Sequence, residues 1–234
     1  MYLTELKHVA SVDFPTRWAG FRLSAFEGSY ANPGRKREKS TALALTLGRF
    51  HDIAPIVRIH SQCITGEVFH SLRCDCHDQL HLALRTTAGA GAGIVVYEQQ
   101  EGRGIGLVEK IKAYELQDQG LDTIEANRQL GHDVDLRDYR LAVDILRWLS
   151  LRSIRLMTNN PDKIAAVKAS GIEIVERVSA TVAANSCSEL YLLTKKAMLG
   201  HFWEESAAEG TPLDCLNLPR VRGGTAAENQ FENN

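Results

Sequence analysis

Apolar residues in the first part of the chain form short runs or alternate with polar residues, which is the pattern of β-strands. Three segments show this pattern: GFRLSAF (20–26), STALALTLG (40–48) and APIVRIHS (54–61). Turn-forming residues bound each segment, so we expect three strands. The segment EGSYANPGRKREKS (27–40) is polar and basic, and it predicts a loop. The N-terminal part of the fold should therefore be rich in β-structure.

From Gly93 onward the pattern changes to strands that alternate with helices. GIVVYEQQ (93–100) is a short apolar run with a polar end, which predicts a buried strand whose carboxyl end reaches solvent. EGRGIG (101–106) then forms a glycine-rich turn. After that turn, side chains recur at helical spacing at Leu107, Ile111 and Tyr114. Gly120 is placed to end this helix.

A strand, a glycine turn and a helix in this order can bind phosphate on the backbone amides at the helix start. The glycines of the turn lack the spacing of the dinucleotide fingerprint, because its third glycine would fall at Leu107. A nicotinamide cofactor is therefore not expected.

A second helix should begin after GHDVDLRDY (131–139), because an apolar stripe follows at helical spacing: Tyr139, Ala142, Val143, Leu146 and Leu149. Asp135 is expected at the N-cap, with Asp138 three residues on. Arg137 would then face the positive end of the helix dipole, so we expect it to have an anionic partner. A carboxylate close to Arg137 in the sequence would be a sufficient partner.

The segment 153–178, SIRLMTNNPDKIAAVKASGIEIVERV, predicts a βαβ unit with Pro161 at the first helical position and Gly171 after the last. Thr158 follows the first strand, where ligands bind open α/β sheets. Lys163 either reaches a phosphate from there or lies on a solvated helix face. The fold class is thus α/β: a β-rich N-terminal part followed by alternating strands and helices with a βαβ unit.

Composition narrows the class of protein. The 234 residues suit a single domain over 1–216, followed by a tail (217–234) that is poor in apolar residues and expected to be mobile. A net charge of −2 argues against general binding to nucleic acid or membrane surfaces. We expect a cytoplasmic protein, because five cysteines is an odd count and no signal peptide or apolar run of about 20 residues is found.

Three cysteines lie close together in HSQCITGEVFHSLRCDCHDQL (60–80): Cys63, Cys74 and Cys76. Three thiolates on a tetrahedral zinc ion leave one position for water, which such a metal activates for hydrolysis. Two alternatives stay open. The cysteines are small buried residues that fall together by chance, or a nearby histidine closes the site as fourth ligand: His60, His70, His77 or His81.

Together these segments resemble GTP cyclohydrolase II, the first committed enzyme of riboflavin synthesis. The resemblance runs in unbroken order from about Val57 to about Arg177. It rests on RIHSQCITGEVFHSLRCDCHDQL, EQQEGRGIGLVEKIKAYELQDQGLDTIEAN, DVDLRDY, LMTNNPDK and IVERV. The resemblance implies the fold of that family and a homodimer. It also implies zinc on Cys63, Cys74 and Cys76, with an activated water that opens the guanine imidazole ring and releases formate.

The resemblance also implies roles for individual residues. Asp135 matches the proposed proton acceptor, Arg137 a proposed nucleophile that releases pyrophosphate, and Tyr114 a tyrosine of the ring-opening step. Electrostatic stabilisation is the alternative for Arg137, because guanidinium resists deprotonation, and a core position is the alternative for Tyr114. Magnesium should accompany the triphosphate. The positions that match GTP contacts are Arg58, Ile59, His60, Ser61, Gln62, Gln79, Glu101, Gly102, Arg103, Thr123, Thr158 and Lys163.

The chain departs from the family pattern near the cysteines. Gln62 replaces a common glutamate, His77 a usual glycine and His81 a usual glutamate. Two alternatives to the parent activity follow: a related cyclohydrolase with another purine nucleotide or a partial reaction, and a nucleotide sensor with a closed zinc site.

Overall fold

The computed structural model of the chain describes residues 2–31, 38–50, 52–133, 135–182 and 202. The expected tail (217–234) and the domain boundary before it lie outside the described residues, so both stay predictions. None of the helices in the described part is long and apolar enough to cross a lipid bilayer.

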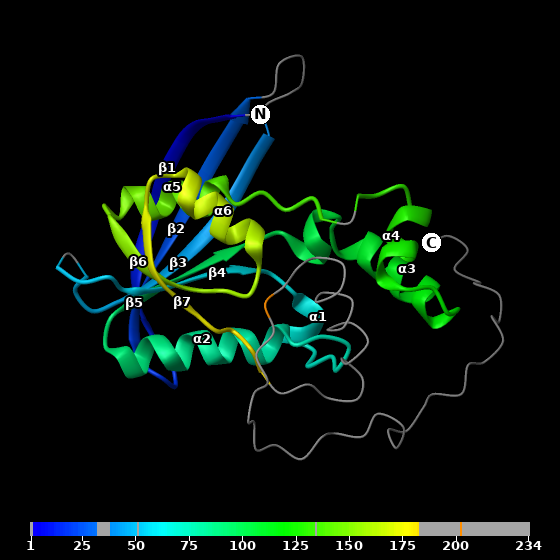
Figure 1. Cartoon of the computed structure of the whole chain (residues 1–234), viewed down its shortest axis with the longest axis horizontal. Coiled ribbons are helices and arrows are strands. Elements are labelled where there is room, and N and C mark those ends of the chain that lie inside the picture. The colour runs from blue at the N-terminus through cyan, green and yellow to red at the C-terminus, as the bar shows by residue number, and fades with distance from the viewer. Residues whose placement is uncertain (1, 32–37, 51, 134, 183–201, 203–234) are drawn as a thin grey trace, which may run out of the picture.

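A seven-stranded mixed sheet runs through the molecule in the order β1-β2-β3-β5-β4-β6-β7 (Figure 1). From β1 to β5 in this order the strands pair antiparallel, and from β5 to β7 they pair parallel. The strands are β1 (Tyr2–Pro15), β2 (Gly20–Ala31), β3 (Glu38–Leu47), β4 (Ile56–Ser61), β5 (Gly93–Glu98), β6 (Ser153–Met157) and β7 (Glu173–Val178).

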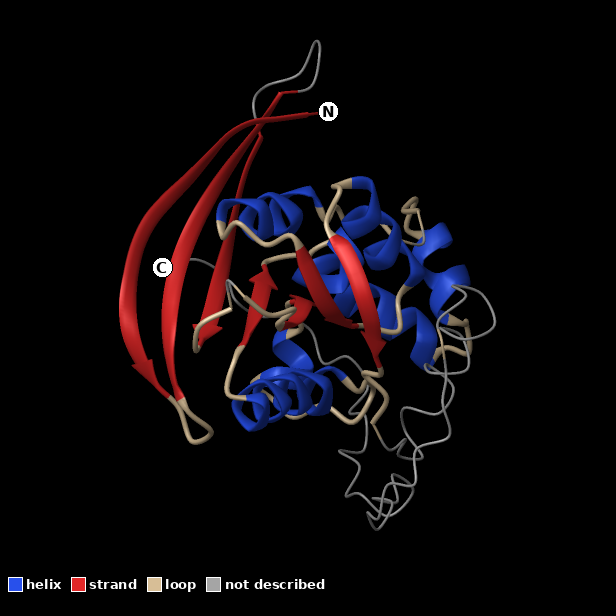
Figure 2. Cartoon of the chain, turned by 60° about the vertical axis from the view of Figure 1, so that its left-hand side comes forward, coloured by secondary structure: helices blue, strands red, loops and turns tan. Residues whose placement is uncertain are grey.

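The predicted strands and the α/β class are confirmed, and the βαβ unit is formed by β6, α6 (Pro161–Ala169) and β7. The loop expected over 27–40 is wrong at both ends, because β2 continues to Ala31 and β3 begins at Glu38. Polar residues pair across these ends, as Glu27 does with Thr41. An antiparallel strand with one solvated face accepts such residues. Figure 2 shows the long antiparallel strands on one side of the sheet, where they extend beyond the helices.

Helices cover both faces of the sheet (Figure 1). α5 (Arg140–Trp148) and α6 lie on one face, and side chains such as Ile145, Leu146 and Val167 pack there in the larger core. α2 (Cys76–Ala90) lies on the other face, where Leu84 packs in a smaller core. Burial of these apolar side chains, at roughly 25 cal/mol per Å², stabilises the three layers.

The remaining helices of the described part lie beyond the carboxyl ends of β4 and β5 (Figure 1): α1 (Ile64–Glu67), the 3₁₀ helix η1 (Glu101–Gly104), α3 (Leu107–Asp118) and α4 (Thr123–Gln129). The helix predicted after the glycine turn is confirmed as α3. Its Leu107 and Ile111 are 41% and 49% exposed. The buried residues of α3 are Lys110 and Ala113.

The helix predicted after residues 131–139 is confirmed as α5, but its predicted N-cap is wrong. The helix begins at Arg140 with Tyr139 at the N-cap, so Asp135 does not cap it and Arg137 lies outside its first turn. Asp135 Oδ1 instead accepts from the backbone N–H of Arg137 at 3.0 Å. Such a bond two residues along the chain forms a local turn that competes with helix. The expected anionic partner of Arg137 is confirmed as the carboxylate of Asp135.

Candidate active site

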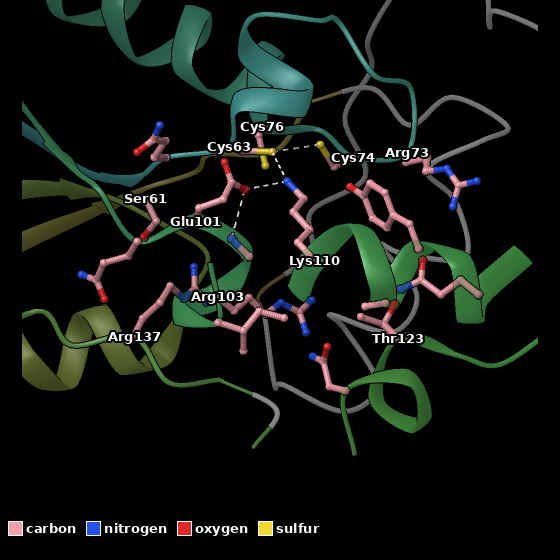
Figure 3. A pocket seen from close by; sticks show the side chains of 18 residues that line it. Ser61, Cys63, Arg73, Cys74, Cys76, Glu101, Arg103, Lys110, Thr123 and Arg137 are labelled. Atoms are coloured by element: carbon pink, nitrogen blue, oxygen red, sulfur yellow. Dashed lines mark hydrogen bonds and ion pairs between the residues drawn. The ribbon is translucent and has the colours of Figure 1, made fainter. Parts of the chain in front are cut away.

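An open cleft lies beyond the carboxyl ends of β4 and β5 (Figure 3). The chain leaves β4 through Gln62 and Cys63 and leaves β5 through Gln100 and Glu101, and all four residues line the cleft. Its volume is about 680 Å³, including the mouth open to solvent. Ligands of α/β sheets bind in this position, outside the carboxyl ends of the strands.

The three cysteines meet at one end of the cleft. Cys63 precedes α1, Cys74 lies in the loop before α2 and Cys76 begins α2, and their sulfurs lie within 4.8 Å of one another. Cys63 Sγ and Cys74 Sγ are 3.6 Å apart. Two sulfurs at about 2.3 Å from one tetrahedral zinc would be roughly 3.8 Å apart. The donor set and its spacing therefore fit zinc.

A fourth protein ligand does not join this group among the described residues. His60 Nε2 is hydrogen-bonded to Glu67 Oε1 at 2.9 Å. His70, His77 and His81 pack against one another instead. The alternative of a closed zinc site thus finds no support in this part of the chain.

Lys110 lies beside the cysteines and was not among the predicted site residues (Figure 3). Its Nζ is 3.1 Å from Cys63 Sγ and donates to Glu101 Oε1 at 2.7 Å. Burial alone would lower the pKa of Lys110, but the Cys63 thiolate and Glu101 raise it. Hydrogen bonds from Cys74 and Cys76, joined by the charge of Lys110, lower the pKa of Cys63. Lys110 therefore stabilises negative charge on sulfur.

Glu101 connects the two loops that form the cleft. Its Oε2 accepts from the backbone N–H of Ile64 at 2.6 Å, at the start of α1. Its Oε1 accepts from the N–H of Gly102 at 3.0 Å and from Lys110. Gly102 and Arg103 both have left-handed backbone, with φ of 60° and 61°. A non-glycine residue in that conformation is costly, and the turn directs Arg103 into the cleft (Figure 3).

A buried network of hydrogen bonds holds the backbone of Cys63. Glu67 Oε1 accepts from the backbone N–H of Cys63 at 2.9 Å, and its Oε2 accepts from Tyr97 Oη at 2.5 Å. Burial raises the pKa of Glu67 to about 7. Burial and the nearby cations Arg58 and Lys163 lower the pKa of His60. His60 therefore acts within this network as a neutral side chain.

Tyr114 points into the cleft from α3, so it is not a plain core residue. Burial raises its pKa to about 12. The guanidinium of Arg73 lies over its ring, 4.9 Å from the centroid. At neutral pH Tyr114 thus keeps its proton and can donate a hydrogen bond.

Two buried cations, Arg58 and Lys163, lie close to Arg137 of the cleft lining. Lys163 is only 4% exposed, and its Nζ donates to the carbonyl of Ile59 at 2.9 Å, so the alternative of a solvated helix face is wrong. Burial lowers the pKa of Lys163, and the charges of Arg58 and Arg137 lower it further. Burial lowers the pKa of Arg58 to about 10. These three cations are close enough to repel one another.

Arg137 and Asp135 form a close ion pair, in which Arg137 Nε is 2.9 Å from Asp135 Oδ1 and a second nitrogen contacts Oδ2. Burial alone would raise the pKa of Asp135, but the hydrogen bonds and charge of Arg137 lower it. Asp135 is therefore ionised and its partner guanidinium is protonated. Arg137 lines the cleft, and its ion pair with Asp135 fixes the orientation of its side chain.

The structure places the predicted GTP-contacting residues in two groups. The first lines the cleft: Ser61, Gln62, Glu101, Gly102, Arg103 and Thr123. The second is not part of the lining: Arg58, Ile59, His60, Gln79, Thr158 and Lys163. Within it, the side chain of Ile59 is 0% exposed and packs in the larger core, so only its backbone is available for contact. Arg58 is held by Gln79 Oε1 at 2.6 Å.

Comparisons with known proteins identify the family of the chain. The family model for GTP cyclohydrolase II matches residues 7–179. GTP cyclohydrolase-2 of Neisseria meningitidis serogroup B is 48% identical over 201 residues, which cover 86% of this chain and 98% of that protein. The protein of the same name from Shewanella pealeana is 46% identical over 86% of this chain and 93% of its own length.

A solved structure, the two-domain 3,4-dihydroxy-2-butanone 4-phosphate synthase RibBX from A. baumannii, covers 77% of this chain and 41% of its own. Its TM-score is 0.41 at 16% identity, which is too low to inform the site. The sequence relatives and the family model support the family assignment, and the family model spans the three cysteines and the cleft described above. The chain belongs to the GTP cyclohydrolase II family.

Proposed function

We propose that this protein hydrolyses GTP by opening the imidazole ring of guanine, with release of formate and pyrophosphate. The product would be 2,5-diamino-6-ribosylamino-4(3H)-pyrimidinone 5′-phosphate, and the reaction would be the first step of riboflavin biosynthesis. The observation that carries the proposal is the trio of cysteine sulfurs at zinc spacing in the cleft of a chain 48% identical to a GTP cyclohydrolase-2.

Cys63, Cys74 and Cys76 would hold the zinc ion. Zinc supplies Lewis acidity there and activates water for hydrolysis. Lys110 offsets the negative charge of the thiolates, because its ammonium group contacts Cys63 Sγ at 3.1 Å. Tyr114 keeps its proton and would donate to a nitrogen of the opening ring.

Arg58, Arg137 and Lys163 would bind the triphosphate. Burial and then the charges of Arg58 and Arg137 lower the pKa of Lys163, and an anion among the three cations would relieve their repulsion. Arg137 would stabilise charge on the phosphoryl group instead of attacking it, since the ion pair with Asp135 keeps the guanidinium protonated. Asp135 would thus position Arg137. Magnesium would be held by the phosphates themselves.

We also expect a homodimer, as the resemblance implies. Leu107, Val108 and Ile111 of α3 are between 41% and 68% exposed and offer an apolar surface for it. Light scattering on the purified protein would give the oligomeric state.

The test is product analysis. Purified protein with zinc and magnesium should release formate from GTP and form a pyrimidine product, with ATP and 7-methyl-GTP measured in parallel. Absence of formate with zinc bound would overturn the proposal. Product from ATP, or ring opening without pyrophosphate, would favour the related cyclohydrolase.

Cys74→Ser should lose zinc and formate release together. Cys215→Ser is the matched control, because the sequence places this cysteine outside the motif 60–80, and it should keep both. Full activity and zinc content in Cys74→Ser would show that the ligand set is wrong.

A further inference from the structure

Arg73 reaches from the loop that carries Cys74 to helix α3, and it lines the cleft (Figure 3). Its guanidinium lies over the ring of Tyr114, 4.9 Å from the ring centroid. The same guanidinium forms an ion pair with Asp118, the last residue of α3. Arg73 therefore joins the loop of the cysteine group to the helix that carries Tyr114.

We propose that Arg73 is a positioning residue, which holds Tyr114 in the orientation needed for ring opening. This inference rests on the proposed function, in which the Tyr114 hydroxyl donates a hydrogen bond to the opening ring. A tyrosine side chain can turn about two torsions, and its hydroxyl moves furthest when it turns. A guanidinium packed over the aromatic ring is attracted to it and restricts that motion. Arg73 thus acts through Tyr114 and not through contact with the substrate.

Asp118 holds Arg73 over the ring. Tyr114 and Asp118 are four residues apart on α3, so they lie on the same side of the helix. Asp118 ends α3, where the negative end of the helix dipole also favours a cation. A planar guanidinium can pair with a carboxylate through its edge and pack against a ring through its face. The point charge of a lysine cannot do both.

Lys110 is a second cation near this ring, with its Nζ 5.7 Å from the centroid. Its Nζ donates to Glu101 Oε1 at 2.7 Å and to Thr65 Oγ1 at 2.8 Å, and it contacts Cys63 Sγ at 3.1 Å. These contacts direct Lys110 to the cysteine group. The two cations therefore have separate roles, since Lys110 balances the thiolates and Arg73 orients the tyrosine.

The steady-state kinetics of formate release from GTP test the proposal. Arg73→Met should lower kcat roughly tenfold and leave the KM for GTP within about twofold, because orientation is lost and substrate binding is not. Arg73→Lys should recover part of the kcat. Asp118→Asn should lower kcat by a smaller factor, and it carries the test if Arg73→Met folds poorly. Arg85→Met, at an exposed arginine of α2, is the control and should match the parent.

A double-mutant cycle separates the positioning of Tyr114 from a merely structural role of Arg73. Tyr114→Phe removes the hydroxyl and keeps the ring. In that background Arg73→Met should change kcat by less than about twofold, because the group that it positions is already absent. Elemental analysis measures the zinc content of each variant, which should equal that of the parent.

Three outcomes with an active parent would overturn the proposal and leave the proposed function untouched. The first is unchanged kcat in both Arg73→Met and Asp118→Asn; a rise in KM alone would then indicate that Arg73 contacts GTP directly. The second is an equal loss of kcat with and without the Tyr114 hydroxyl. The third is loss of zinc from folded Arg73→Met, which would mean that Arg73 supports the metal loop. A zinc-loaded parent that releases no formate would instead refute the proposed function, and the role of Arg73 with it.

Discussion

Gly66 shows how a single residue fits the cysteine group. A Cβ atom on Gly66 would lie 2.9 Å from Cys74 Sγ and 3.4 Å from Cys63 Sγ. The first distance is too short for carbon and sulfur, so a side chain here has to displace the sulfur. The residue at the centre of α1 therefore has to be glycine because of the cysteines, and not because of its backbone conformation.

Gly66→Ala should lower zinc affinity by roughly tenfold or more, because the new methyl group displaces Cys74 Sγ from its position. Elemental analysis after dialysis against a competing chelator measures the loss. Gly89→Ala is the control, since no atom lies within 4 Å of a Cβ built there in α2. It should retain zinc and add up to about 1 kcal/mol of stability. Equal zinc retention in both variants would refute the steric argument.

Lys110 and Glu101 form a buried ion pair in the site. Their side chains are 11% and 10% exposed, respectively. Removing one partner leaves a buried charge without compensation, so Lys110→Met should cost roughly 3 kcal/mol in the free energy of unfolding. Urea unfolding measures it.

Lys112→Met provides the comparison on the same helix, because Lys112 is 54% exposed and pairs with Glu109 at the surface. It should cost less than about 1 kcal/mol. Adding Glu101→Gln to Lys110→Met should recover part of the loss. If Lys110→Met costs no more unfolding free energy than Lys112→Met, the ion pair between Lys110 and Glu101 does not hold η1 to α3.

At the scale of the element, α4 depends on its N-terminal cap. Asp122 accepts from the backbone N–H groups of Ile124 and Glu125 at 2.7 and 2.8 Å. Glu125 Oε2 in turn accepts from the N–H of Asp122 at 3.0 Å, which completes a capping box. Since α4 begins at Thr123, the cap also fixes a residue that lines the cleft.

Asp122→Ala should reduce the free energy of unfolding by about 1 kcal/mol and raise the KM for GTP, because the first turn of α4 loses its cap. Asp122→Asn keeps an oxygen acceptor and should behave nearly as the parent does. Urea unfolding and steady-state kinetics on the three proteins check both effects. Identical stabilities of the Ala and Asn variants would contradict the capping argument.

At the scale of the whole molecule, the mixed sheet buries a carboxyl group. Glu98 ends β5 and is 1% exposed. Burial raises its pKa from 4.5 to about 8, although Lys163 and the backbone of Ala142 oppose the shift. The folded protein therefore binds this proton at pH values at which the unfolded chain has released it. Stability should fall as the pH rises from about 4.5 to about 8 and level off above that.

Glu98→Gln should flatten this pH dependence, because the amide has no proton to release. At pH 8 and above the variant should be more stable than the parent, on the order of 3 kcal/mol. Urea unfolding over the pH range measures the slope. Glu173→Gln replaces an exposed glutamate of β7 and should keep the slope of the parent. A parent whose stability does not change between pH 5 and 8 would show that Glu98 is not held neutral.

Much of this molecule follows from its sequence. The alternation and the apolar runs predicted β2 to β7 with the exception of strand ends, because the period of apolar residues is a local property of the chain. The cysteine spacing predicted the three-sulfur group for the same reason, since Cys63, Cys74 and Cys76 lie within one short segment that contains only α1, a loop and the first residue of α2. The polar face of β1 and the turns at Asp135 and Asp138 lack such a periodic signal, and there the sequence prediction missed a strand and misplaced the N-cap of a helix.

Only the tertiary structure decided which side chains complete the site. Lys110 is 47 residues from the sulfur it contacts, and Lys163 is 104 residues from the carbonyl it binds. Contacts over such separations depend on how β4, β5 and β6 lie in the sheet, which no local pattern records. The same holds for Glu98, whose pKa is set by the layers packed on both sides of it. The sequence by itself determined most of the elements and the group of three cysteines, and the fold determined their electrostatic environment, because burial and charge act through space.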